Sequence, residues 1–270
     1  MSNLTPISIE SSPISHEETY VHAIYEEIAS HFSQTRYKPW PLIAKFLASI
    51  EAGSIGLDSG TGNGKYLPLD QGGRVCIVGM DRSKSLLQFA QRAGNKYRDV
   101  VWGDALGLGW RRGSFDFAIS IATIHHFSTE ERRCEAIVAL IFALKPNGGR
   151  LLTYVWAVEQ DQLSKRVVPI SDPDNTRGQD VLVPWVLATS EGSVPSPSPT
   201  KEQPFRTKIL HMFASSELRQ LVCRAASRLN LQVGTPPVPS ENFKSAKGLE
   251  IVQEGWERSN YYLEARLWQS

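Results

Sequence analysis

A glycine-rich loop and three aspartates are the residues whose types and spacing point to ligand chemistry. The loop has the sequence DSGTGNG at residues 58–64 and follows a short apolar run. Glycines at alternate positions let a backbone pass very close to a ligand. Asp81 and Asp104 each follow a further apolar run. Ligands of open α/β sheets bind beyond the carboxyl ends of the strands, so we expect Asp58, Asp81 and Asp104 to share one site.

Two ligands fit a loop of this kind, a dinucleotide and S-adenosylmethionine. The dinucleotide fingerprint is G-x-G-x-x-G with the pyrophosphate on a helix N-terminus, whereas the spacing here is G-x-G-x-G. The carboxylate of Asp58 would also repel a pyrophosphate, but it favours the ammonium group of S-adenosylmethionine. Asp81 is expected to bind the ribose hydroxyls, as acids also do in NAD enzymes, and Asp104 the adenine amino group. The structural alternative is a glycine turn with solvent-exposed acids.

The cofactor prediction extends to the neighbours of these residues. The full set of expected S-adenosylmethionine contacts is Asp58, Gly60, Gly62, Asn63, Tyr66, Asp81, Arg82, Asp104, Ala105 and Ile121.

Strand and helix patterns alternate around the loop. The expected strands are the apolar runs at residues 54–59, 74–81, 100–103, 115–124, 151–156 and 261–268. The expected helices are the amphipathic segments at residues 42–50, 83–93, from 128 onward and 215–229. This order predicts a doubly wound, Rossmann-like α/β fold of the class I methyltransferase type, with a mostly parallel seven-stranded sheet and helices on both faces.

Composition separates one domain from two irregular segments. Residues 1–15 are rich in Ser and Pro and are expected to be disordered, with a capping box at Ser15 and Glu18 starting the first helix. Residues 16–270 are expected to form a single domain with a flexible insertion at about 158–208, which contains a Ser/Pro run at 193–199. The apolar segment 180–186 within the insertion is expected to dock.

Charge and cysteine content exclude several classes of protein. The net charge of +1 excludes binding of nucleic acid through overall charge. The three cysteines are far apart and odd in number, so neither a disulfide framework nor a metal site is expected. Residues 1–6 lack the features of a signal peptide and no apolar run could span a bilayer, so no membrane contact is expected. We expect a reducing, intracellular location, the cytoplasm first and the nucleus second.

Several longer runs resemble one known family. The most specific are HFSQTRYKPWP at 31–41 and SFDFAISIATIHHFSTEERR at 114–133, with shorter matches YVH at 20–22, YEEIA at 25–29, GNGKYL at 62–67, WAVEQ at 156–160 and QDVLVPW at 179–185. On these runs the chain resembles the eukaryotic tRNA wobble-uridine carboxymethyl methyltransferases from about residue 17 onward. It departs from them at Ser59, at Thr61, where the family has cysteine, and around residues 210–213, where the family is more aromatic.

The resemblance implies methyl transfer from S-adenosylmethionine to the carboxylate of 5-carboxymethyluridine at the wobble position of a tRNA anticodon loop, giving the methyl ester. A carboxylate is already ionised at pH 7, so the chemistry requires positioning and no general base. The fork of Arg36 suits a carboxylate, and a neutral His125 or His126 can donate one hydrogen bond. His125 is favoured to face the substrate. Arg36 has a structural alternative, pairing with an acid at a helix C-terminus.

Aromatic residues near these groups are candidates for holding the base. Tyr37, Trp40 and Trp156 are expected to stack on the uracil or its neighbours, since unpaired RNA bases are often held in this way. Core packing is the alternative for Trp40.

The family resemblance also implies a small zinc-binding activator subunit that forms a heterodimer with the catalytic chain. The strand at residues 100–102 (VVW) would lie at an edge of the sheet and is apolar for an exposed edge. Pairing with a strand of the activator would cover it.

Three other functions remain open at this stage. A small-molecule O-methyltransferase and a non-catalytic scaffold subunit with the same fold both fit the elements. A nucleotide-dependent oxidoreductase is disfavoured by Asp58 and by the loop spacing.

Overall fold

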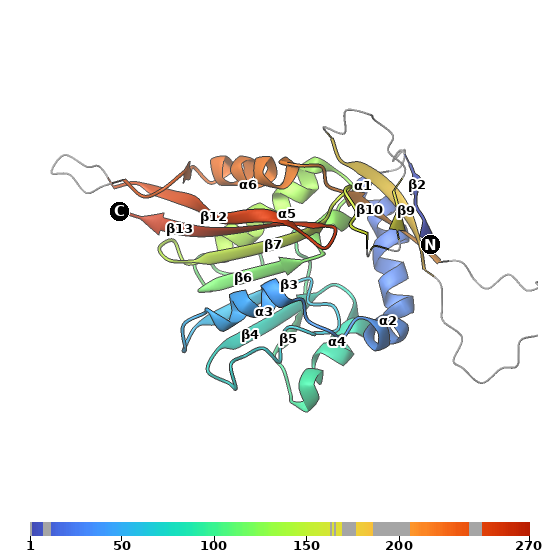
Figure 1. Cartoon of the computed structure of the whole chain (residues 1–270). Coiled ribbons are helices and arrows are strands. Elements are labelled where there is room, and N and C mark those ends of the chain that lie inside the picture. The colour runs from blue at the N-terminus through green and yellow to red at the C-terminus, as the bar shows by residue number, and fades with distance from the viewer. Residues whose placement is uncertain are drawn as a thin grey trace, which may run out of the picture.

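The computed structural model describes residues 2–7, 12–162, 164, 166–168, 177–185, 206–237 and 245–270. Its centre is a sheet of eight strands in the order β11-β12-β13-β7-β6-β3-β4-β5 (Figure 1). Their bounds are β3 (Ile55–Ser59), β4 (Cys76–Asp81), β5 (Val100–Trp102), β6 (Phe117–Ile121), β7 (Arg150–Trp156), β11 (Gln232–Val233), β12 (Lys247–Glu257) and β13 (Asn260–Gln269). No helix among the described residues is long and apolar enough to cross a membrane.

The sheet is mostly parallel, as predicted. Strands β5, β4, β3, β6 and β7 pair in parallel, while β13 is antiparallel to both β7 and β12. All six strands expected from apolar runs are present. The eighth strand is the two-residue β11, which pairs with the start of β12 and makes the sheet one strand wider than predicted.

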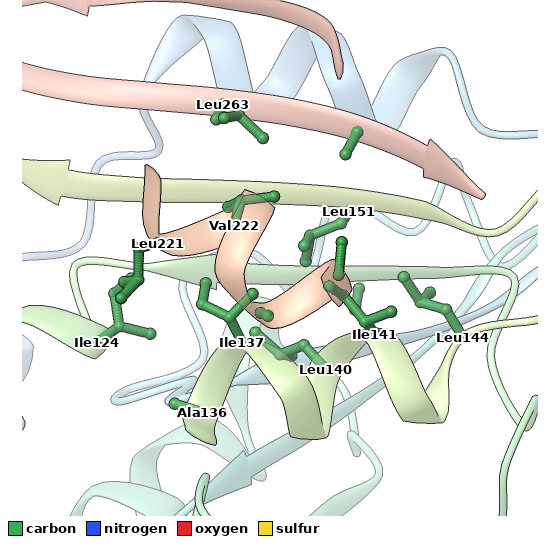
Figure 2. Close-up of a cluster of buried hydrophobic side chains, with 14 of the residues drawn as sticks. Ile124, Ala136, Ile137, Leu140, Ile141, Leu144, Leu151, Leu221, Val222 and Leu263 are labelled. Atoms are coloured by element: carbon green, nitrogen blue, oxygen red, sulfur yellow. The ribbon is translucent and has the colours of Figure 1, made fainter. Parts of the chain in front are cut away.

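Helices cover both faces of the sheet, which confirms the doubly wound arrangement. They are α3 (Pro41–Ala48) and α4 (Lys84–Ala90) on one face, and α5 (Glu130–Ala143) and α6 (Glu217–Arg228) on the other. Side chains alternate along β6: Phe117 and Ile119 join the cluster with α3, and Ala118 joins the cluster with α5. Figure 2 shows Ile137 and Leu140 of α5 gathered with Leu151 of β7 and with side chains of α6. This packing holds the strand ends that carry the candidate site.

The N-terminal helical segment begins earlier than the sequence indicated. It consists of α1 (Pro13–Glu17), the π-helix η1 (Glu18–His22) and α2 (Ala23–Thr35). Ser12 is the N-cap and Pro13 opens the first turn, so the capping box expected at Ser15 is wrong. Proline is favoured at a first helical position because its missing N–H has no helical partner there. Glu18, the acid of the expected box, pairs with Arg82 instead, while the buried Glu17 accepts hydrogen bonds from Ser128 and Arg132.

A second, three-stranded sheet lies beside α2 at one end of the molecule (Figure 1). It consists of β2 (Thr5–Pro6), β9 (Gln179–Trp185) and β10 (Arg206–Met212), and we call it the cap. A two-stranded pair joins β1 (Ser2–Asn3) to β8 (Arg166–Val167). The structure thus gives paired strands at residues 2–3 and 5–6, where disorder was expected, because β8 and β9 offer edges with which these residues pair. The Ser/Pro run at 193–199 lies outside the described residues.

Candidate active site

A cavity of about 290 Å³ opens at the carboxyl ends of β3, β4, β6 and β7. The cap and α2 contribute its other walls. The predicted site residues that line it are Arg36, Trp40, Asp58, Gly60, Gly62, Asn63, Tyr66, Asp81, Arg82, Asp104, Ala105, Ile121, His125, His126 and Trp156. Among the residues predicted from the sequence, only Tyr37 does not line this cavity.

The glycine loop leaves β3 in a conformation that demands glycine. Gly60, Gly62 and Gly64 have φ values of 79°, 58° and 73°, in the left-handed region that residues with a Cβ avoid. A Cβ on Gly60 would collide with the side chain of Thr123, and one on Gly64 would lie 2.7 Å from the Cα of Ala90. The backbone N–H of Gly60 donates to the carbonyl of Met80 at 2.8 Å. The loop is therefore fixed against the end of β4.

Asp58 is buried at the start of this loop, with 1% of its surface exposed. The hydroxyl of Thr61 donates to its carboxylate at 2.7 Å. Burial raises the pKa of Asp58 to about 7, and the charge of Asp81 adds to this, while the Thr61 hydroxyl and the Lys65 ammonium oppose it. A carboxyl group with such a pKa ionises readily when a cationic ligand arrives. Thr61, which stands where the family resemblance led us to expect cysteine, thus bonds directly to the acid.

The acids after β4 and β5 are oriented by local hydrogen bonds. The carboxylate of Asp81 accepts from the N–H of Gly62 at 2.8 Å and of Ser83 at 2.9 Å. Burial raises the pKa of Asp81. Arg82 bridges Asp104 at 2.9 Å and Glu18 at 2.7 Å, so the predicted contacts Arg82 and Asp104 form an ion pair with each other.

Lys65 is a cavity residue for which the sequence analysis predicted no role. Its Nζ lies 4.8 Å from the ring centroid of Trp40 and 4.9 Å from that of Tyr66. Burial lowers the pKa of Lys65 to about 8, with Asp58 opposing and Arg36 adding to this shift. Lys65 follows Gly64 in the sequence, but its contact with Trp40, 25 positions earlier, is one that spacing alone does not reveal.

Two adjacent histidines follow β6 in the 3-10 turn η3 (Ile124–His126). The N–H of Trp156 donates to Nδ1 of His125 at 3.3 Å, so a neutral His125 carries its proton on Nε2. His126 Nε2 lies 3.0 Å from the hydroxyl of Tyr25. Burial, and next the charge of Lys208, lower the pKa of His126 well below its usual range. Both rings line the cavity, 4.5 Å apart between centroids.

Arg36 lies at the end of α2, where its side chain is exposed and reaches the cavity. Its Cζ lies 5.6 Å from the ring centroid of Trp185, a residue of the cap. Tyr37, the next residue, is 60% exposed and does not line this cavity, so its role in holding the base stays a prediction. Trp40 lines the cavity and also packs against the core, and its stacking on the base stays a prediction.

Comparisons with known proteins are consistent with this geometry. Residues 57–152 match the family described as Methyltransferase domain. The chain is 36% identical over 257 residues to the tRNA (carboxymethyluridine(34)-5-O)-methyltransferase of Schizosaccharomyces pombe, covering 93% of this chain and 97% of that protein. The chain belongs to this family. The Saccharomyces cerevisiae member is 47% identical over 65% of this chain and the Xenopus tropicalis member 36% identical over 80%. The matches span 59% and 39% of those two proteins.

Solved structures of other methyltransferases share the fold of this family member. The CcbJ methyltransferase of Streptomyces caelestis aligns with a TM-score of 0.58 at 14% identity, covering 90% of this chain and 97% of that one. A Burkholderia thailandensis 1,6-didemethyltoxoflavin-N1-methyltransferase aligns with a TM-score of 0.57 at 16% identity, covering 97% and 94%. The predicted fold class and the predicted family are both confirmed.

The family assignment does not explain the cavity residues that no motif predicted. They include Tyr25 of α2, Lys65 of the loop, and Trp185 and Lys208 of the cap. Tyr25 and Trp185 lie within the runs that carried the resemblance. The contact between helix α2, which carries Tyr25, and the cap, which carries Trp185, depends on the tertiary fold. Within the described part of the chain, no group of three or more His, Cys, Asp or Glu side chains could hold a metal ion.

Proposed function

We propose that this protein transfers a methyl group from S-adenosylmethionine to the carboxylate of 5-carboxymethyluridine at the wobble position of tRNA. The observation that carries the proposal is the single cavity that joins an acid-lined glycine loop to a wall of cations, neutral histidines and aromatic rings. The first part suits a cationic cofactor and the second suits an anionic base. Membership of a family named for this reaction supports the same assignment.

The cofactor side of the cavity fits S-adenosylmethionine. The cofactor supplies a methyl group bonded to a sulfonium, which an oxygen nucleophile displaces without a general base when that nucleophile is already ionised. Asp58 would ionise and favour the ammonium group, and Asp81 would accept hydrogen bonds from the ribose hydroxyls. Gly60 and Gly62 would allow close approach of the backbone. The remaining proposed contacts are Asn63, Tyr66, Arg82, Asp104, Ala105 and Ile121.

The acceptor side would position the carboxylate. Arg36 presents a guanidinium with a fork that matches a carboxylate, and it is held above Trp185. His125 carries its donor on Nε2, because Nδ1 accepts from Trp156, and is the histidine we propose to face the substrate. His126 accepts from Tyr25 and would keep its ring in place. Trp40 and Trp156 would stack on the base or its neighbours.

We also propose that a small zinc-binding activator subunit pairs with β5. This strand ends the sheet, and Val101 and Trp102 are 41% and 61% exposed. Tyr97 and Leu108, which flank the strand, are 75% and 62% exposed. An unpaired apolar edge of this kind is a template for strand addition. The enzyme would act where tRNA is modified, in the cytoplasm or also in the nucleus.

One experiment tests the reaction. The chain is incubated with S-adenosylmethionine and tRNA bearing 5-carboxymethyluridine, with and without the activator, and the nucleosides are analysed by mass. We expect the modified nucleoside to gain one CH₂ unit, and no such gain on the free nucleoside. Methylation of small acids without methylation of tRNA would favour the small-molecule enzyme. The absence of any gain in both conditions would refute the proposal.

A further inference from the structure

Lys208 of the cap is the most deeply buried cation of the cavity wall. It belongs to β10 and is 4% exposed, yet it lines the same cavity as the histidine pair and Arg36. Burial of an ammonium group is costly unless something nearby stabilises the charge. The burial of Lys208 in the cavity wall therefore indicates that its charge has a role in the cavity.

Three aromatic side chains surround the ammonium of Lys208. Its Nζ donates to the hydroxyl of Tyr25 at 2.9 Å. It lies 5.1 Å from the ring centroid of Tyr25, 5.3 Å from that of Trp156 and 5.4 Å from that of Trp185. Aromatic faces within about 6 Å attract a cation, so the three rings stabilise the ammonium group. Trp156 in turn lies 5.5 Å from the ring of His125. Lys208 is thus placed against the groups proposed to hold the acceptor base.

The hydrogen bonds around Tyr25 have a fixed direction. Since the Tyr25 oxygen accepts from Lys208, its O–H is left to donate to Nε2 of His126. Burial raises the pKa of Tyr25, which keeps this proton on the phenol. The charge of Lys208 also helps to lower the pKa of His126, so the histidine beside it stays neutral. Lys208 therefore supplies positive charge to this wall, and His126 does not.

We infer that Lys208 binds the carboxylate of the acceptor base and makes the cavity selective for an anionic acceptor. The inference rests on the proposed function and adds a specificity residue to it. A lysine ammonium can donate a hydrogen bond to a carboxylate oxygen, and Lys208 lines the same cavity as the histidine pair. Lys208 is 4% exposed, and attraction between opposite charges is stronger at such a buried place than at the surface. Arg36 is exposed, so solvent and salt screen its charge and Lys208 contributes more to discrimination.

The test compares two anticodon stem-loops that differ only in charge. One carries 5-carboxymethyluridine and the other its neutral isostere, 5-carbamoylmethyluridine. Dissociation constants are measured on the full chain with S-adenosylhomocysteine bound, so that no turnover occurs. We expect the native protein to prefer the carboxylate by about tenfold or more, which corresponds to about 1.4 kcal/mol. In Lys208→Met and Lys208→Gln this preference should fall to near unity, and in Lys208→Arg it should persist.

The controls separate this inference from the proposed function. Lys145→Met removes an exposed lysine that pairs with Asp116 at the other end of the sheet, and should leave the preference unchanged. Affinity for S-adenosylhomocysteine reports on folding in each variant, and the charge-retaining Arg variant keeps the comparison available if a neutral variant unfolds. Suppose that the native chain methylates the carboxylate. Full preference for the carboxylate in Lys208→Met or Lys208→Gln would then overturn the role of Lys208 alone, and so would a loss of preference in Lys208→Arg. A native chain that methylates the carboxylate without preferring it would also overturn the role of Lys208 alone, whereas a native chain that does not methylate it would overturn both proposals.

Discussion

At the scale of single residues, the ionisation of Asp58 is the property most directly linked to cofactor binding. The carboxyl is buried and its pKa is raised to about 7, so near neutral pH it is partly protonated in the free protein. The Thr61 hydroxyl, which donates at 2.7 Å, stabilises the ionised form. A ligand ammonium would stabilise that form further, and binding would then release a proton below pH 7.

This coupling predicts a pH-dependent affinity for the cofactor. Affinity for S-adenosylmethionine should rise by up to about tenfold per pH unit on the acidic side and level off near pH 7, where the ligand amine, with a pKa near 8, is still protonated. Asp58→Asn should bind on the order of tenfold more weakly at neutral pH, because a hydrogen bond to a charged group contributes roughly 1.5–3 kcal/mol. Its affinity should not vary over this range. Calorimetric titration at several pH values measures both quantities.

The same substitution tests the direction of the pKa shift of Asp58. A carboxyl whose pKa is raised by folding loses stabilisation as the pH rises from its unfolded pKa to its folded one. The free Asp58→Asn protein should therefore unfold at a higher temperature than the native protein at pH 8, although it binds the cofactor less well. Equal pH profiles of affinity in the two proteins would contradict the role given to Asp58.

The residues of the site differed in how far the sequence could predict them. Asp58, Asp81 and Asp104 lie at or just after the carboxyl ends of strands, and the sequence alone predicted that they share one site. Arg36 and the histidine pair were predicted through a family resemblance. Lys208 and Tyr25 are 183 positions apart, and their hydrogen bond depends on how the cap docks, which no local pattern encodes. Tyr37 does not line the cavity, and its role stays a prediction from the sequence.

At the scale of elements, a buried histidine joins the cap to the main domain. His211 of β10 bonds through Nδ1 to Asp180 of β9 at 2.9 Å and through Nε2 to Glu217 of α6 at 2.6 Å. Burial opposes the charge of His211, but the hydrogen bonds to the two carboxylates outweigh it and raise its pKa. Both nitrogens face acceptors, so the bound form is the imidazolium. Glu217 also accepts from the N–H of Ala214, which fixes the start of α6.

This contact predicts that the attachment of the cap to the main domain depends on pH. Because the pKa of His211 is raised in the folded protein, its stabilisation is complete below about pH 6.5 and is lost as the pH rises through the folded pKa. His211→Asn should lower the free energy of unfolding by about 3 kcal/mol at pH 6, since it leaves two carboxylates without their cation. The loss should shrink at higher pH. Chemical denaturation at several pH values measures it, with hydrogen exchange in β9 and β10 locating the change.

A surface pair serves as the matched control for His211. Glu254→Gln breaks an ion pair with Arg219 in which both side chains are more than 40% exposed, at 42% and 47%. Such pairs contribute about 0–1 kcal/mol, so this variant should behave like the native protein. If His211→Asn destabilised the protein as little as Glu254→Gln at pH 6, the stabilising role of the His211 imidazolium would be disproved.

The N-terminal helix is held by a second buried charge. Glu17 accepts from Nε of Arg132 at 2.8 Å and from its Nη2 at 2.6 Å, and its side chain is 2% exposed. Hydrogen bonds from Arg132 and Ser128 outweigh the effect of burial and lower the pKa of Glu17. Helix α2 carries Tyr25 and is followed directly by Arg36, so this pairing also positions the cavity wall.

Replacement of Glu17 should destabilise the protein in a way that fades in acid. A carboxyl with a lowered pKa stabilises the fold above its unfolded pKa, near 4.5, and this contribution disappears as the pH falls through the folded pKa. Glu17→Gln should cost about 3 kcal/mol at pH 7 by leaving Arg132 unpaired in a buried place. Thermal unfolding at pH 7 and below pH 4 measures the difference. Glu130→Gln, at an exposed pair with Arg224, should cost little at either pH.

At the scale of the whole molecule, strand order followed from the sequence better than strand number. Apolar runs such as β6 are buried on both faces and predict parallel central strands. Strand β12 escaped prediction because it contains two glycines and alternates with exposed polar residues. The pairing of β2 with β9 joins residues more than 170 positions apart, so the segment at residues 2–6 looks unstructured until the cap is folded.

The exposed edge at β5 makes a final prediction about assembly. Val101 lies in the middle of this strand and is 41% exposed, while Trp102 is tied down by a hydrogen bond from its Nε1 to the carbonyl of Arg82 at 2.8 Å. Lysine on an edge strand opposes strand addition, so Val101→Lys should abolish copurification with the activator subunit. Affinity for S-adenosylmethionine in the isolated chain should stay within about threefold of native, since a surface substitution away from the site costs at most about 0.5 kcal/mol. Methylation of tRNA in the presence of the activator should fall with the loss of the complex.

Val252→Lys alters a similarly exposed valine (49%) on β12, at the opposite side of the sheet, and should leave the complex intact. A complex that survives Val101→Lys but not Val252→Lys would locate the activator at the β12 edge instead.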